Sequence, residues 1–147
     1  MRGIVLLLLA LLAAAASAQA TDPALSIDVH RLAVMMSQSR AHLATMTALP
    51  DAVVEPPEEA SDVDTLVWAI GQYNAIAGRA CRTGNLPARL CIGPYAPPWL
   101  SAAHGDVGDD RLRGMADEAS ARLQPLWEAI CAKARRSHAP EPVCPME

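Results

Sequence analysis

The sequence predicts an all-α protein, a small up-and-down bundle of three long helices and one short helix, stapled by two disulfides. Three observations predict this fold class. Apolar residues recur at three- and four-residue spacings in three long segments. Proline- and glycine-rich stretches separate those segments. Strand-like alternation, internal repeats and low-complexity tracts do not occur in the sequence.

The first helix is predicted to begin at Asp22-Pro23, because an N-cap carboxylate followed by proline is a favourable helix start. It ends before Pro50. Its apolar stripe consists of Leu25, Val29, Leu32, Met36, Leu43 and Met46. Residues 51–60 are acidic and contain paired prolines, which is typical of a linker.

The second helix is predicted to start at Ser61, with Asp64 three residues later as in a capping box. Gly84 is its expected C-terminal stop. One face carries an apolar stripe of Val63, Leu66, Val67, Ile70, Tyr73, Ala77 and Cys81.

Residues 83–105 are rich in turn-forming residues, with a short helix expected from Pro98 to Ala103. The last long helix starts at Asp109-Asp110, and Pro125 predicts a kink or a split within it. Its stripe consists of Leu112, Met115, Ala119, Leu123, Leu126, Ile130 and Ala134. Residues 140–147 form a proline-rich tail that we expect to be extended.

The first 20 residues are typical of a cleaved secretory signal peptide. Arg2 supplies a positive start, and an unbroken apolar run extends from Ile4 to Ala16. Small residues that follow fit cleavage after Ala18 or Ala20. Because the run is shorter than the roughly 20 residues that span a bilayer, we expect it to be removed rather than to serve as a membrane anchor. Residues 21–147 would then be a single helical domain without membrane insertion.

The amino-acid composition limits the cellular compartments and the classes of binding partner to be expected. The 147 residues carry a formal net charge of −4, which argues against the basic face that nucleic-acid binding requires. Lys133 is the only lysine and alanine is abundant, a bias typical of GC-rich bacterial genomes. Together with the export signal, this bias predicts a periplasmic protein, with full secretion as the alternative.

Four cysteines in an exported chain predict two disulfides. The spacings do not match the short Cys-x₂₋₄-Cys step of structural zinc sites, and without a Cys-x-x-Cys pair there is no redox motif. Three connectivities are possible. The sequential one, Cys81–Cys91 and Cys131–Cys144, is preferred because each bond would fasten an irregular segment to a helix end.

The most distinctive candidate site is a proline-stiffened loop with two aromatic residues. It contains Tyr95, Pro97, Pro98, Trp99 and Leu100. This loop could present a binding surface to an envelope protein partner, since aromatic residues dominate interface hot spots. Alternatively, Trp99 and Leu100 could fold back as a plug over the open end of the bundle.

Two other hypotheses stay open. Met35, His42 and Met46 lie near one face of the first helix, where thioether and imidazole ligands would suit copper, although a methionine stripe is more often core. Ser101, His104 and Asp106 could serve a hydrolase, although sequence proximity does not supply catalytic geometry. No cofactor is expected. The sequence therefore favours a non-enzymatic periplasmic binding or accessory module of unknown specific role.

Overall fold

The computed structural model describes residues 21–47, 55–102 and 107–136. They form three α-helices, α2 (Pro23–Thr47), α3 (Asp62–Arg82) and α4 (Asp109–Arg136), and two short 3₁₀ helices, η1 (Ala88–Leu90) and η2 (Leu100–Ala102). No strand occurs in these ranges, so the predicted all-helical class is confirmed. The predicted signal peptide (1–20) and tail (140–147) lie outside the described residues.

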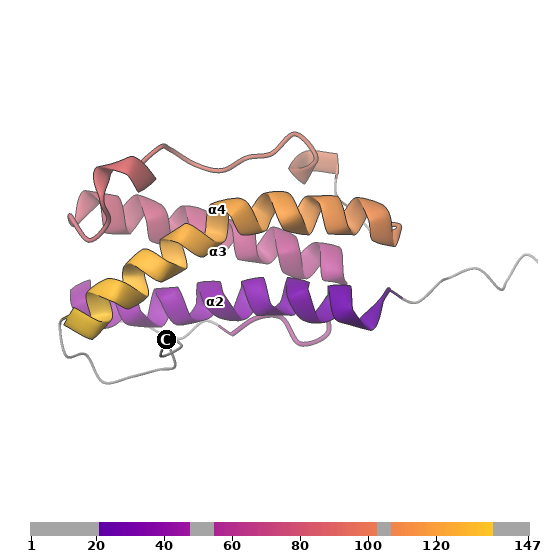
Figure 1. Ribbon diagram of the computed structural model, residues 1–147, viewed down its shortest axis with the longest axis horizontal. Helices are drawn as coiled ribbons and strands as arrows, with labels where there is room; N and C mark the ends of the chain where they lie inside the picture. The colour runs from indigo at the N-terminus through magenta and orange to yellow at the C-terminus, as the bar shows by residue number, and fades with distance from the viewer. Residues whose placement is uncertain (1–20, 48–54, 103–106, 137–147) are drawn as a thin grey trace, which may run out of the picture.

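The three helices form a bundle, but they run parallel, and the predicted up-and-down order is wrong (Figure 1). Contacts near the helix starts establish the direction. The Ser26 hydroxyl of α2 donates to the carboxylate of Asp62, the first residue of α3, at 2.8 Å. The backbone N–H of Asp22 donates to Asp109, the first residue of α4, at 3.1 Å. All three N-termini therefore meet at one end of the bundle.

The connections are long enough to allow this parallel order. An up-and-down bundle uses short loops, whereas a parallel neighbour requires the chain to travel back along a whole helix. The 25 residues of α2 rise about 37 Å. Residues 48–61 separate α2 from α3, and an extended chain of that length can span about 46 Å. Residues 83–108 form a still longer return from α3 to α4.

Parallel packing aligns the helix dipoles, and charged side chains offset the resulting repulsion at both ends. At the N-terminal end, an Asp22 carboxylate oxygen accepts from the backbone N–H of Ala24 at 3.0 Å. The acidic residues in the first turns of α3 and α4 are Asp62, Asp64, Asp109 and Asp110. The basic residues in the last turns of the same helices are Arg79, Arg82, Lys133, Arg135 and Arg136. The bundle therefore has an acidic end and a basic end.

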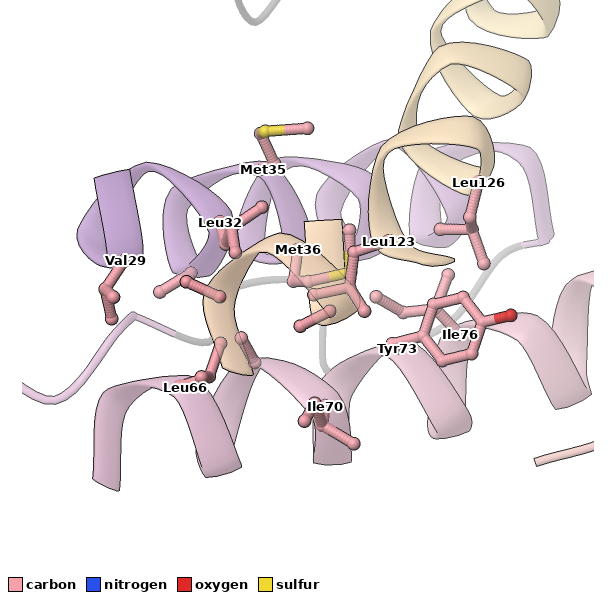
Figure 2. Close-up of a cluster of buried hydrophobic side chains, with 14 of the residues drawn as sticks. Val29, Leu32, Met35, Met36, Leu66, Ile70, Tyr73, Ile76, Leu123 and Leu126 are labelled. Carbon is pink, nitrogen blue, oxygen red and sulfur yellow. The ribbon is translucent and has the colours of Figure 1, made fainter. Parts of the chain in front are cut away.

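The core lies where the apolar stripes of α2, α3 and α4 meet. Figure 2 shows Met36 of α2 pointing toward α3 and lying beside Leu123 of α4, with Ile70 of α3 below them. These side chains are almost completely buried. Most of the predicted stripe residues belong to this core, and Met46, Val67 and Cys81 are half-buried against it.

The predicted helix ends are largely confirmed. The Ser61 hydroxyl accepts from the backbone N–H of Asp64 at 3.1 Å, which caps α3. Gly84 follows the last turn of α3 with φ +69°, a conformation in which glycine avoids the steric cost of a Cβ. Pro125 does not split α4, which continues through it to Arg136. The ribbon of α4 instead changes direction in its C-terminal half and crosses α2 (Figure 1). The predicted short helix is reduced to the 3₁₀ turn η2.

The disulfide between Cys81 and Cys91 is confirmed. It joins the last turn of α3 to the residue that follows η1. Cys131 is buried in α4 and is not a free thiol. Its predicted partner Cys144 lies outside the described residues, so the second pairing stays a prediction.

Candidate functional site

The distinctive loop of the sequence forms an extended segment that lies lengthwise along the bundle (Figure 1). We call residues 91–99 the strap. It begins after η1 and ends just before η2. The strap contacts α3 and α4 along their sides. The plug hypothesis expected it to cover an open end of the bundle, and it does not.

The first attachment of the strap is covalent. The Cys81–Cys91 disulfide fixes its start to the end of α3. Two residues later, Gly93 has φ +89°, so a side chain at this position would strain the backbone. The Gly93 carbonyl accepts from Nη2 of Arg122 in α4 at 3.1 Å. The start of the strap is thus joined to two helices.

The second attachment is centred on Tyr95. The side chain of Asn74 in α3 makes two hydrogen bonds with the backbone of Tyr95. Its Oδ1 accepts from the Tyr95 N–H at 2.7 Å, and its Nδ2 donates to the Tyr95 carbonyl at 2.9 Å. The Tyr95 ring stands edge-to-face with Tyr73, their centroids 6.3 Å apart. The guanidinium of Arg122 lies 5.7 Å from the Tyr95 ring and 5.8 Å from the Tyr73 ring, and its Nε donates to the Tyr73 hydroxyl at 2.9 Å. One arginine therefore links α4, α3 and the strap.

The third attachment is the indole of Trp99. Its Nε1–H donates to the carboxylate of Glu118 in α4 at 2.7 Å. The same carboxylate lies near the Tyr95 hydroxyl, which is buried and has no hydrogen-bond partner of good geometry. Burial, reinforced by the negative charge of Glu118, raises the pKa of Tyr95 to about 12, although Arg122 acts in the opposite direction. Tyr95 is therefore a neutral phenol at physiological pH.

These attachments give the strap an inner and an outer face. Pro97 is buried, and Tyr95, Trp99 and Leu100 pack partly buried against the core. We call the exposed residues of the strap its outer face. They are all uncharged: Cys91, Ile92, Gly93, Pro94, Ala96 and Pro98. Ile92, at 60%, and Ile27 of α2, at 61%, are the large hydrophobic side chains that lie exposed among the described residues. Of the five predicted binding residues, only Pro98 is exposed on the outer face.

A cavity of about 230 Å³ lies between α3 and the start of the strap. Ala77 and Gly78 leave room on the helix side, and Pro94 and Leu90 line the opposite side together with the disulfide. This volume is below the roughly 300–1,000 Å³ of pockets that enclose drug-sized ligands. The strap therefore bridges the helix rather than packing closely along its whole length.

Comparisons were made with models of protein families, with curated proteins and with solved structures. None of the three finds a match. Among the helices that the structure describes, none has the length and apolar character needed to cross a membrane.

The predicted copper ligands have mixed environments. Met35 and His42 are buried, and Met46 is half-buried against the core. Met35 points away from the side chains between α2 and α3 (Figure 2). The three residues share one side of α2, at successive spacings of seven and four residues. A metal site at these residues stays a prediction.

The hydrolase hypothesis concerns a segment that the structure describes only in part. Ser101 is exposed in η2, whereas His104 and Asp106 lie outside the described residues. In the described ranges, no group of three or more His, Cys, Asp or Glu side chains is placed to hold a metal ion. The geometry of the described residues thus draws attention to the strap.

Sequence reasoning missed the residues that hold the strap. Arg122 and Glu118 are spaced as an i,i+4 ion pair within one helix, but Arg122 reaches Tyr73 and Glu118 reaches Trp99. Asn74 is on the flank of a predicted amphipathic helix. Its partner Tyr95 is 21 residues away, and Tyr73 is 49 residues from Arg122. Periodicity within one helix contains no signal for contacts at such separations.

Proposed function

We propose that this protein is an exported, non-enzymatic binding module that contacts another protein of the bacterial envelope through the outer face of the strap. Export to the periplasm, or beyond the cell, is supported by the predicted leader and by the Cys81–Cys91 disulfide, which persists in oxidising compartments. The observation that carries the proposal is the outer face itself. Its residues are apolar, exposed and fixed in place by attachments on the inner face.

Pre-organisation is what makes this face suited to binding. A free loop loses conformational entropy when it is ordered by a partner, and that loss weakens association. The strap is already held by a disulfide, by two hydrogen bonds to Asn74 and by the Trp99–Glu118 hydrogen bond. A partner would therefore order few additional torsions.

The chemistry of the outer face also indicates the kind of partner. Extended proline-containing segments bind grooves lined by aromatic side chains, which accept the proline rings without requiring charge complementarity. Pro94 and Pro98 are exposed at a four-residue spacing, with Ala96 between them and Ile92 before them. We therefore expect a partner with an aromatic-lined groove.

The test compares two isoleucines of equal exposure. Ile92 on the strap is 60% exposed and Ile27 on α2 is 61% exposed. A photo-crosslinking amino acid at position 92 should give a discrete adduct in cells, and the same residue at position 27 should not. With the purified partner, Ile92→Asp should weaken binding at least tenfold and Ile27→Asp less than twofold. Adducts at neither position, or equal adducts at both, would refute the proposed surface.

Trp99→Ala provides an independent measurement. Loss of the indole N–H removes the bond to Glu118 and frees the end of the strap. We expect partner binding to fall while the helical circular dichroism is retained. Loss of the helical signal would instead show that Trp99 serves mainly the fold.

A further inference from the structure

A second hollow in the bundle lies between α2 and α3 and contains two arginines. The groove has a volume of about 190 Å³. Arg40 and Leu43 of α2 line it together with Ala75, Ile76 and Arg79 of α3. Leu43 and Ile76 are each only 2% exposed, so they provide an apolar floor. Two positively charged side chains from different helices therefore line one groove together with apolar side chains.

Neither guanidinium is neutralised by a described carboxylate. The ion pairs in the described ranges join Arg31 to Asp28, and Arg113 to Asp22 and Asp110. Arg40 donates from Nη1 to the neutral side-chain oxygen of Gln72 at 2.7 Å. Arg79 contributes a buried Nε that has no acceptor within the described part of the chain.

The buried Nε of Arg79 needs a partner, because an unsatisfied buried donor destabilises the fold and a charged donor costs more than a neutral one. A position in the last turn of α3 explains why a cation is favourable there, since it offsets the helix dipole. The dipole does not explain why the Arg79 Nε has no hydrogen-bond acceptor, or why a second arginine, Arg40, lines the same groove. Because this Nε is closed off from solvent, an anion in the groove would neutralise the guanidinium as a whole rather than bond to that one atom.

We propose that this groove binds a small amphiphilic anion, with its oxygen-bearing head on Arg40 and Arg79 and a short alkyl tail on Leu43 and Ile76. Guanidinium groups bind carboxylate and phosphate oxygens through paired hydrogen bonds, and the head group can be either one. The volume of the groove restricts the tail to a short chain, since larger ligands need larger pockets. This inference is independent of the strap and of its proposed partner.

The experiment measures binding of four probes to the purified protein by calorimetry and by NMR of the arginine side chains. Octanoate and octyl phosphate test the two head groups. Octanol tests the tail without a charge, and inorganic phosphate tests the charge without a tail. We expect one of the two amphiphiles to bind with 1:1 stoichiometry and to shift the Arg79 Nε–H resonance. Octanol and phosphate should each bind at least tenfold more weakly.

Variants then locate the site. Arg79→Gln should weaken binding of the tight probe about tenfold or more, the effect expected for loss of a charge-assisted hydrogen bond. The control is Arg82→Gln, which removes the same charge from an exposed position three residues along α3. It should leave the affinity unchanged within twofold, and circular dichroism should show both variants folded. Equal loss in both variants, octanol binding as tightly as the two amphiphiles, or no binding of either amphiphile would overturn the proposal.

Discussion

The helical body and the strap are held by different physical forces. Buried apolar side chains hold the three helices together, and Met36, Ile70 and Leu123 are almost fully excluded from solvent. The strap is held mainly by one disulfide and by hydrogen bonds with Asn74, Glu118 and Arg122, and only part of its inner face packs against the core. We infer that the body carries most of the stability. The strap can then change or loosen without unfolding the helices.

The largest effect is expected in the core. Leu123 of α4 is completely buried and lies beside Met36 in Figure 2. Leu123→Ala removes apolar contacts and leaves a cavity, which should lower the free energy of unfolding by about 2–5 kcal/mol. Chemical denaturation followed by circular dichroism measures this change.

Ile27→Ala is the matched control, because it shortens an aliphatic side chain that is 61% exposed. It should change stability by less than about 0.5 kcal/mol. If both substitutions had the same effect, the body would not be held by this core.

The disulfide should have the next largest effect. It closes a loop with a sequence separation of 10, for which chain entropy predicts a stabilisation of up to about 3 kcal/mol. The double variant Cys81→Ser, Cys91→Ser should lower the denaturation midpoint while the chain remains helical. A loss of all helical signal would show that the body cannot fold without the first attachment of the strap.

Arg122 tests the polar attachments. Arg122→Gln removes the contacts of the guanidinium with Tyr73 and Gly93. Because each half-exposed hydrogen bond contributes about 1 kcal/mol, we expect a modest loss of global stability. Hydrogen exchange in residues 91–96 should rise more than exchange in α4.

Arg111→Gln is the control for charge, since Arg111 is exposed near the start of α4. It should leave exchange in the strap unchanged. An equal increase in both variants would mean that net charge, rather than the Arg122 contacts, holds the strap.

The smallest effect concerns alkaline pH. The pKa of Tyr95 is raised from 10.0 to about 12 in the folded protein, first by burial and then by Glu118. Between these values the unfolded chain loses a proton that the folded chain retains, so stability falls as pH rises through this window. Below pH 10 the contribution of the neutral phenol is fully present.

Tyr95→Phe should reduce this loss of folding stability at alkaline pH. Unfolding free energies of the wild type and the variant, measured at pH 9.0 and at pH 11.5, give the difference. Absorbance at the phenolate wavelength should also show one tyrosine that titrates late in the wild type and is absent from the variant. Identical pH slopes would contradict the environment described for Tyr95.

The sequence was sufficient to predict the helices but not their direction. Stripes, the Ser61 cap and the Gly84 stop are local signals, and they place α2, α3 and α4 with small errors at their ends. Helix direction depends on which faces pack and on where the connecting chain returns. An up-and-down bundle needs only short connections between its helices. The connections here, residues 48–61 and 83–108, are long.

The candidate site was predicted only as a segment. Proline and aromatic composition drew attention to Tyr95 and Trp99, but could not show that both turn inward and leave Ile92 and Pro98 exposed. That outcome depends on Asn74, Arg122 and Glu118, whose partners lie far away in the sequence. Long-range polar contacts are invisible to periodicity.

The most direct test of the division between body and strap is amide hydrogen exchange in the wild type and in Asn74→Ala. This substitution removes both hydrogen bonds between the Asn74 side chain and the Tyr95 backbone. We predict at least tenfold faster exchange at the Tyr95 amide, with central amides of α4 unchanged. Equal acceleration in the strap and in α4 would show one cooperative unit, and unchanged exchange at Tyr95 would show that Asn74 does not hold the strap.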